Sequence, residues 1–335
     1  MPESRVISVM KAFKQDLLSR EGTQQALMTR RWMQVEARLM GDMQALGEEI
    51  ARTATSGTIM TETQLWRNDR YRALLAQTRL EIAKYQTWAD GLISHEQAVM
   101  GELGIDHAVK TIQAAQIDAD LRLAFNRLPV EATQYMVGLC ADGAPLFDVL
   151  AQRALLPDAI DGLRTALLQG TSLGWNPRKT ARAMADGLTQ GLQKALVIAR
   201  DSQLRVYRAA SDAEYQASGV VQDKVRVCAK DGRTCLACLA KDGEVLGLNE
   251  PGFDHTQGRC TFVPRVVGMD AIAFTKGPQW FDGLDESKQR EMMGPALFKA
   301  WDGGRGFDFT ALATITQHET WGQGLAVTPL SQLVG

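Results

Sequence analysis

The sequence predicts a mainly α-helical protein: long N-terminal helical hairpins and a helical bundle, then a small α+β module and a short helical tail. Three observations lead to this fold class. Two long stretches near the N-terminus contain no proline and carry hydrophobic residues at steps of three and four. Four of the five cysteines lie between Cys228 and Pro264. The residues around those cysteines are mostly Lys, Asp, Gly, Arg and Thr, which cannot build a hydrophobic core alone.

Length and composition set the class of protein. At 335 residues, with 45% hydrophobic and 23% charged residues, the chain resembles soluble globular proteins with two or three cores. A net charge of −2 argues against a protein that mainly coats nucleic acid. Charged residues such as Arg5 and Lys11 interrupt residues 1–25, and no hydrophobic run reaches about 18 residues. We therefore expect no signal peptide, no membrane span and a reducing compartment.

The first long helix is predicted for residues 23–52. Its hydrophobic positions mark a single face: Met28, Trp32, Val35, Leu39, Met43, Leu46 and Ile50. A helix of about 30 residues is about 45 Å long. Residues 53–61 are expected to end it, with Ser56–Gly57 as the turn.

A second long helix is predicted for residues 62–100. Its stripe alternates steps of four and three: Tyr71, Leu75, Thr78, Ile82, Tyr85, Ala89 and Leu92. Such a stripe forms a seam against a partner helix. The preceding helix is the simplest partner and would give an antiparallel hairpin, but a helix of another subunit or protein would fit equally. Charged residues on the other faces are expected to be solvated: Arg67, Arg70, Arg72, Arg79, Glu81 and Lys84.

The hairpin is expected to end at residues 101–105 and to be followed by shorter helices. These are predicted for residues 106–125, 129–139, 145–154 and 158–169, with prolines in several first turns and Cys140 in the core.

A longer helix is predicted for residues 178–218, with a kink near Gly187 or Gly191. Residues 178–233 hold 11 Lys and Arg against 6 Asp and Glu. This basic helix would suit DNA or an acidic protein surface, and a solvated helix face explains it equally well.

The cysteine-rich stretch has the spacing of a metal site. Cys235 and Cys238 form a C-x2-C pair, and His255 and Cys260 follow at a distance that a second pair of ligands requires. An Asp242–Gly243 turn between residues 239–240 and 245–246 predicts a hairpin that brings the two pairs together. Four protein ligands would close the coordination sphere of a structural zinc ion.

Two other interpretations of these cysteines stay open. Reduced cysteines can simply act as small buried hydrophobic residues. A disulfide would need an oxidising compartment, which the absence of a secretory signal argues against.

The same stretch resembles the C-terminal module of the phage head morphogenesis family, the minor head proteins similar to protein F of phage Mu. The matching residues are Asp231, Thr234, Cys235, Cys238, Asp242, Gly243, Pro251, His255, Arg259, Cys260 and Pro264, with Ile198, Ala199, Arg200 and Tyr207 in the preceding helix. The resemblance covers about residues 171–264, and more weakly extends to Gly304. The N-terminal part shares only its helical character.

Two departures concern the metal ligands. Gly258 stands where the family has the first cysteine of a Cys-Arg-Cys motif, and Cys228 is an additional cysteine upstream. We expect Cys260 to be the fourth ligand and keep Cys228 as its substitute.

After this module the sequence predicts a strand at residues 263–267 and a helix at 287–301 that Gly303–Gly304 stops. A helical piece is predicted for residues 310–318, in an uncharged C-terminal tail suited to docking or disorder. The predicted domains are residues 1–125, 126–218, 219–268 and 269–335.

No catalytic motif is found. The chain has no phosphate-binding loop and no G-x-S-x-G sequence. A zinc deaminase would need an H-x-E motif before a P-C-x-x-C motif. Here the histidine follows the cysteine pair and the glutamate is missing. A nuclease of the His-Asn-His type would need further histidines and asparagines, and only Asn249 is near. We therefore expect no enzymatic activity.

The resemblance implies a structural virion protein: a portal-associated minor head (minor capsid) protein of a tailed bacteriophage, acting in head morphogenesis and genome packaging or ejection. Expected partners are the portal protein, the major capsid or scaffold protein, and genomic DNA through the basic helix. The expected location is the virion head, and the host cytoplasm during assembly. The alternative is a zinc-stapled nucleic-acid-binding protein or nuclease.

Overall fold

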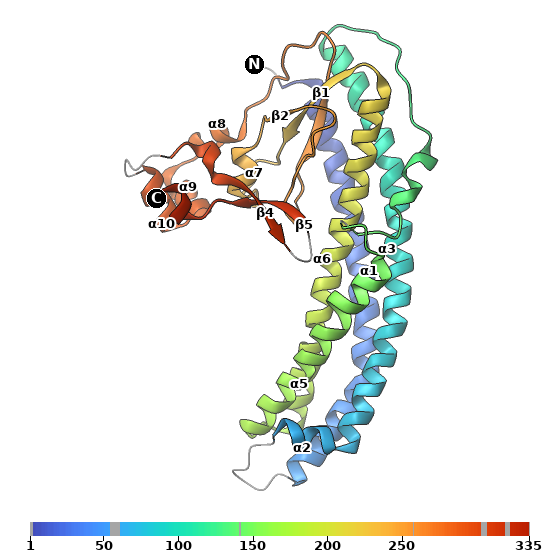
Figure 1. The fold of residues 1–335 in the computed structure, drawn as a ribbon. Coiled ribbons are helices and arrows are strands. Elements are labelled where there is room, and N and C mark those ends of the chain that lie inside the picture. The colour runs from blue at the N-terminus through green and yellow to red at the C-terminus, as the bar shows by residue number, and fades with distance from the viewer. Residues whose placement is uncertain are drawn as a thin grey trace. The chain divides into compact units, whose positions relative to one another are not determined.

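The fold is mainly helical with a small strand region, which confirms the predicted fold class. The computed structural model describes residues 3–53, 61–140, 142–256, 258–302, 307–318 and 322–334 (Figure 1). The chain forms two compact units. The helical unit comprises Ser19–Glu96 and Gly138–Ser202, and the mixed unit comprises Met1–Leu18, Gln97–Val137 and Gln203–Gly335. The four predicted domain boundaries stay a prediction.

The long helices supply both units. They are α1 (Arg5–Thr53), α3 (Asp69–Asp118) and α6 (Pro177–Ser218), and each contributes a segment to the helical unit and another to the mixed unit. The helical unit is completed by α2 (Glu62–Arg67), α4 (Leu146–Val149), a π-helical turn (Leu150–Leu155) and α5 (Leu156–Ser172). None of the helices in the described ranges is long and hydrophobic enough to cross a membrane.

The predicted hydrophobic stripes meet inside the helical unit. All seven stripe residues of the first helix are buried. The rings of Trp32 of α1 and Tyr85 of α3 pack edge to face, with 4.9 Å between their centroids. The Tyr85 hydroxyl donates to the Met28 carbonyl at 3.2 Å. The seam of the second helix therefore packs within the chain. Its last position is shifted, because Ile93 is buried in place of Leu92.

Two expectations about this region were wrong. The charged face of α3 is not wholly solvated, because Glu81 is buried. Arg38 and Lys84 each donate to a different Glu81 carboxylate oxygen at 2.6 Å, which makes this burial tolerable. The break at residues 101–105 is also absent, since α3 continues to Asp118. A Cβ at Gly104 would lie 2.5 Å from the Tyr207 carbonyl, so this glycine permits close packing within the mixed unit rather than ending a helix.

The glycines of α6 have a similar role in the helical unit. The helix is unbroken at Gly187 and Gly191, where a kink was expected. A Cβ at Gly162 of α5 would lie 2.3 Å from the Gly187 carbonyl oxygen. A Cβ at Gly191 would lie 2.5 Å from the Leu155 carbonyl oxygen. These glycines let the two helix backbones touch.

The shorter helices differ from their predicted bounds. Residues 119–129 contain no helix, and a 3₁₀ helix at Val130–Met136 replaces the helix predicted for 129–139. The predicted helices at 145–154 and 158–169 form one continuous helical stretch through α4, the π turn and α5. Cys140 is not a helix core residue, because it lies half-buried in the loop before α4. Most of the turn predicted at 53–61 lies outside the described residues.

An antiparallel sheet in the order β2-β1-β3 carries the cysteine-rich stretch in the mixed unit (Figure 1). Its strands are β1 (Val221–Val227), β2 (Val245–Leu246) and β3 (Thr261–Val266), so the strand predicted near residue 263 is confirmed. The predicted 239–246 hairpin is wrong, because residues 239–240 belong to helix α7 (Leu236–Ala240) and β2 pairs with β1. Gly243 has a φ of 87° and donates its N–H to the Arg226 carbonyl at 2.9 Å, which turns the chain out of α7 onto β1.

The cysteine-rich stretch contributes to two hydrophobic clusters of the mixed unit. The first joins one face of the sheet to the ends of the long helices and includes Val6, Ile112, Tyr215, Val225 and Val263. The second surrounds α7 and includes Cys238, Cys260, Phe281, Phe309 and Leu325. The second cluster thus joins the cysteine-rich module to the C-terminal segment.

The C-terminal segment is packed rather than loose. It contains α8 (Gly277–Asp282), α9 (Glu286–Met293), α10 (Pro295–Asp302), a 3₁₀ helix (Phe309–Leu312), β4 (Ala313–His318), β5 (Gly322–Val327) and α11 (Leu330–Leu333). The single helix expected at 287–301 is divided, because Gly294 has a φ of 74°. The helix expected at 310–318 is mostly strand β4, which pairs with β5. The expected stop at Gly303–Gly304 lies outside the described residues.

Candidate metal centre

Helix α7 positions the first pair of candidate ligands. Cys235 is the N-cap of α7, and its Sγ accepts the backbone N–H of Cys238 at 3.3 Å. Residues three apart on a helical turn lie on the same side, so the two sulfurs are presented together. Before the helix, the Asp231 carboxylate accepts the Arg233 N–H at 3.0 Å and the Thr234 hydroxyl at 3.1 Å. This turn fixes the direction in which Cys235 enters α7.

An irregular segment between β2 and β3 carries the second pair. We call residues 253–256 and 258–260 the ligand loop; it supplies His255 and Cys260. The Nδ1 of His255 lies 2.8 Å from the Thr256 carbonyl oxygen. A carbonyl only accepts, so Nδ1 carries the proton and Nε2 is left as the donor atom for a metal ion.

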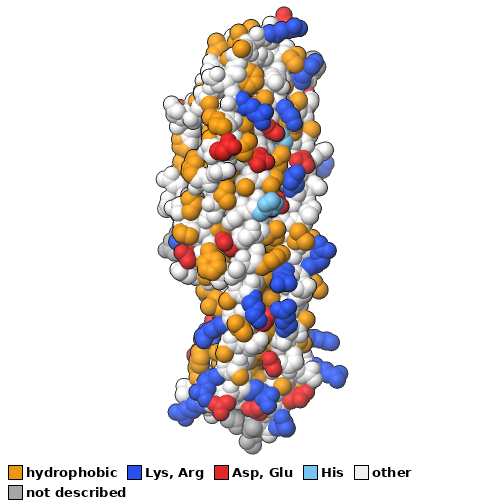
Figure 2. Space-filling model, turned by 90° about the vertical axis from the view of Figure 1, so that its right-hand side faces the viewer, with side chains coloured by type: hydrophobic (Ala, Val, Ile, Leu, Met, Phe, Trp, Pro, Cys, Tyr) orange, Lys and Arg blue, Asp and Glu red, His pale blue; other side chains and the backbone are white. Residues whose placement is uncertain are grey.

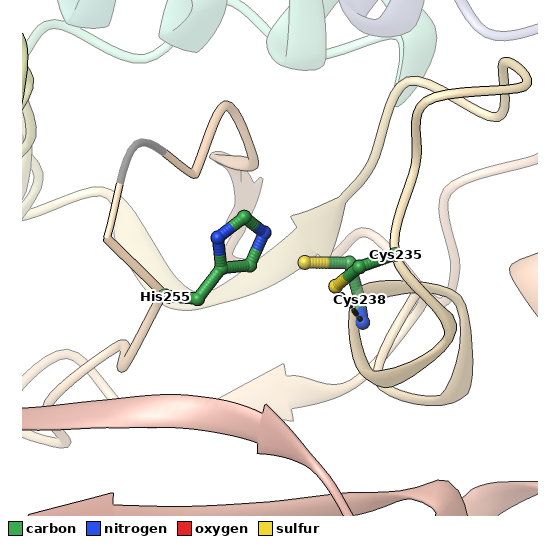
Figure 3. A group of neighbouring side chains, drawn as sticks. All are labelled: Cys235, Cys238 and His255. Carbon is green, nitrogen blue, oxygen red and sulfur yellow. Dashed lines mark hydrogen bonds between the residues drawn. The ribbon is translucent and has the colours of Figure 1, made fainter. Parts of the chain in front are cut away.

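The candidate donor atoms form two overlapping groups. Cys235, Cys238 and His255 make one group, and Cys238, Asp254 and Cys260 make the other; within each, the donor atoms lie within 4.8 Å of one another. Figure 3 shows the sulfurs of Cys235 and Cys238 on the side facing the His255 ring. These five residues lie close together and could bind a metal ion. A cavity of about 70 Å³ adjoins all four predicted ligands and is also lined by Lys14 and Arg259.

The electrostatics of the first group favour a charged pair. Hydrogen bonding from Cys238, and secondarily from His255, lowers the pKa of Cys235 to about 4. Hydrogen bonding with the Cys235 sulfur raises the pKa of His255 to about 9. The hydrogen bond to Cys235 raises the pKa of Cys238, whose proton is retained. A divalent cation at this position would replace the imidazolium proton as the partner of the Cys235 thiolate.

Asp254 is a candidate donor that the spacing argument missed. Its side chain is nearly buried and forms an ion pair with Arg208 of α6, with 2.7 Å between Nη2 and Oδ2. A Cβ at Gly258 would lie 2.2 Å from the Asp254 carboxyl carbon. The carboxylate therefore occupies the space that a side chain at position 258 would need. The adjacency of Asp254 to His255 was visible in the sequence, but nothing there connected it to Arg208.

Cys228 belongs to neither donor group. It is buried, and burial raises the pKa of its thiol. Its backbone N–H donates to the Asp242 carboxylate at 2.6 Å, and Asp242 also binds Lys230 at 2.9 Å. The identity of the fourth ligand stays a prediction, with Cys260 as the expected residue.

Part of the predicted basic region is neutralised within the chain. Lys194 pairs with Asp158 at 3.2 Å, and Arg200 pairs with Glu21. Lys224 is buried against Asp212 at 2.7 Å.

On the face drawn in Figure 2, Lys and Arg side chains stand among Asp and Glu side chains, so charges of both signs share that surface.

Comparison of the chain with family models, curated proteins and solved structures found no match. The resemblance to the phage head morphogenesis family therefore stays a prediction.

Proposed function

We propose that the chain is a portal-associated minor head protein of a tailed bacteriophage, acting in head morphogenesis and in genome packaging or ejection. Its partners would be the portal protein and the major capsid or scaffold protein. It would be found in the virion head, and in the host cytoplasm during assembly. Its role is structural rather than enzymatic.

The observation that carries this proposal is the convergence of the motif residues. Cys235 and Cys238 on α7 and His255 and Cys260 on the ligand loop belong to two donor groups that share Cys238. Other matching residues support the same module. Asp231 and Thr234 form the turn before α7, and Gly243 turns the chain after it. Residues that match the family's motif thus contribute to one small module of this fold. This supports a module shared with that family over a chance match of residue spacing.

We propose that the metal ion is zinc and that it is structural. Thiolates and imidazole are the donors that structural zinc sites use, whereas Ca²⁺ and Mg²⁺ require oxygen ligands. Elemental analysis of protein purified without chelator is expected to find about one zinc per chain, as a closed four-ligand site requires. Folded protein without metal would contradict this assignment.

Co-expression with portal, scaffold and capsid proteins from the same phage tests the head role. We expect the chain to sediment with heads on a density gradient, at a few copies per portal by mass spectrometry. Heads made without the portal protein are the control and should contain far less of it. Recovery only in the free fractions, with heads forming normally, would refute the proposal.

The alternative is a zinc-stapled nucleic-acid-binding protein or nuclease that uses the basic helix. The ion pairs of Lys194 and Arg200 weaken it, because they reduce the free positive charge of α6. Retention of the purified chain on DNA that falls steeply with salt would favour this alternative. Genomic DNA stays among the proposed partners only if that retention is found.

A further inference from the structure

We propose that Arg208 determines which side chain completes the metal centre. By holding the Asp254 carboxylate, it leaves Cys260 as the fourth ligand and so makes the site one of three thiolates and one imidazole. This inference rests on the proposed metal site but not on the proposed head role. Arg208 acts as a positioning residue, since it touches neighbours of the metal ion rather than the ion.

Two donors compete for the fourth position. The Asp254 carboxylate and the Cys260 sulfur both lie within 4.8 Å of the Cys238 sulfur and of each other. Cys235, Cys238 and His255 already form the other group. The position of the Asp254 carboxylate therefore decides between a site with three sulfurs and a site with two sulfurs and one oxygen.

Both carboxylate oxygens of Asp254 are engaged. Oδ2 accepts from Arg208 Nη2 at 2.7 Å, in a pair whose side chains are only 4% and 17% exposed. Oδ1 accepts the backbone N–H of His255 at 2.9 Å and faces the Cys238 thiol at 3.7 Å. A charge-assisted hydrogen bond at low exposure is strong, and binding a metal through Oδ2 would deprive the Arg208 guanidinium of its carboxylate partner.

The same guanidinium fixes the backbone that carries the competing ligand. Arg208 donates from Nη2 to the Gly258 carbonyl at 2.6 Å and from Nε to the Cys260 carbonyl at 3.2 Å. One side chain thus holds the carboxylate through Oδ2 and also fixes the backbone that carries Cys260. Two further contacts secure the start of the loop: Arg226 donates to the Phe253 carbonyl, and the Leu325 N–H of β5 donates to the Asp254 carbonyl at 3.2 Å.

The donor set determines which metals the site prefers. Three thiolates and an imidazole favour zinc over harder divalent ions, whereas a carboxylate ligand makes the site harder. Replacing Arg208 by a neutral residue releases Asp254 to displace Cys260. The metal would then still bind, but with one sulfur fewer.

Cobalt(II) substitution of the full chain tests this proposal, because the intensity of the sulfur-to-cobalt charge-transfer band follows the number of bound thiolates. We expect the wild type and Arg208→Lys, which keeps the ion pair, to give a three-thiolate band. Arg208→Gln should lose about one third of that band, as expected for two thiolates in place of three. Adding Asp254→Asn to Arg208→Gln should restore it. Arg178→Gln, an exposed change on the same helix, should leave the band unchanged.

The cysteine variants separate the outcomes further. Cys260→Ser should reduce the band in the wild type but not in Arg208→Gln, where Cys260 no longer binds. A full three-thiolate band in Arg208→Gln would overturn the proposal. If Arg208→Gln does not fold, a wild-type band that falls with Asp254→Asn, or is unchanged in Cys260→Ser, would overturn it. A wild type that binds neither cobalt nor zinc would overturn both this inference and the proposed metal site.

Discussion

The helical unit and the candidate metal centre are stabilised in different ways. In the helical unit, residues such as Trp32 and Tyr85 are buried because they recur along one face of their own helices. In the candidate metal centre, the ligand loop has no regular structure, and its carbonyls are bound by Arg208, Arg226 and Leu325 from other elements. The periodicity of each helix therefore determines which side chains of the helical unit are buried, whereas the structure of the ligand loop depends on contacts between residues far apart in sequence.

The largest effect is expected from removing the ligand shared by both donor groups. Cys238→Ser should abolish metal binding, because both donor groups lose the sulfur they share. Structural zinc sites supply about 10 to 16 kcal/mol of binding free energy that is coupled to folding, so the module should also be destabilised. Elemental analysis and hydrogen exchange check this. Exchange should rise in α7 and the ligand loop while the α1–α3 pairing of the helical unit stays protected.

Two other cysteines serve as controls. Cys140→Ser, outside the module, and Cys228→Ser, outside both donor groups, should bind as much metal as the wild type. Loss of metal from Cys228→Ser would reassign the fourth ligand to Cys228. Increased hydrogen exchange throughout the helical unit of Cys238→Ser would show that this unit also depends on the metal, contrary to the comparison above.

The second prediction concerns the core of the helical unit. Trp32→Ala should lower the free energy of unfolding of that unit by about 3 to 5 kcal/mol, since its side chain is 1% exposed and packs on Tyr85. The amount of metal bound per chain should not change. Met33, the next residue, is 59% exposed, so Met33→Ala should change stability by less than about 0.5 kcal/mol in the same denaturant titration. Equal effects of the two variants would contradict the assigned helix face.

The third prediction separates two glycines of the helical unit. Gly162→Ala should destabilise it by about 1 to 3 kcal/mol, because the new Cβ would meet the Gly187 backbone. A Cβ added at Gly41 in α1 would meet no neighbouring element within 4 Å, so Gly41→Ala should stabilise the helix by about 1 kcal/mol. Thermal unfolding of both variants measures the difference. A stabilising Gly162→Ala would show that α5 and α6 do not approach this closely.

The smallest effect is expected at the buried carboxylate of α3. Hydrogen bonds from Lys84 and Arg38 lower the pKa of Glu81 below its usual 4.5. Its ionised form is therefore stabilised by folding, and this contribution is fully present above pH 4.5 and lost as the pH falls through the lower folded pKa. Glu81→Gln should cost about 1 kcal/mol at neutral pH.

The pH dependence of that cost is the sharper test. The difference in unfolding free energy between the wild type and Glu81→Gln should shrink as the pH falls below 4.5. Glu48→Gln, which alters an exposed carboxylate of α1, should show little difference at any pH. A constant cost down to low pH would mean that packing, not charge, accounts for the effect.

The sequence alone determined the helical class, the buried face of α1 and nearly all of the buried face of α3. Those features follow from periodicity, which each helix expresses through its own backbone hydrogen bonds. The sequence also predicted Cys235, Cys238, His255 and Cys260 as metal ligands from their spacing, and the structure brings them into two overlapping donor groups.

Only the tertiary structure decided the features that depend on distant neighbours. The hairpin was expected to end at residues 101–105 and a kink was expected near Gly187 or Gly191. Gly101, Gly104 and Gly187 instead lie within continuous helices where neighbouring elements approach closely. The hairpin expected at Asp242–Gly243 was replaced by β2 pairing with β1, because strand partners are chosen by burial across the sheet. The ion pair between Arg208 and Asp254 joins residues 46 positions apart. The charge and length of an arginine side chain do not indicate which distant carboxylate it will pair with.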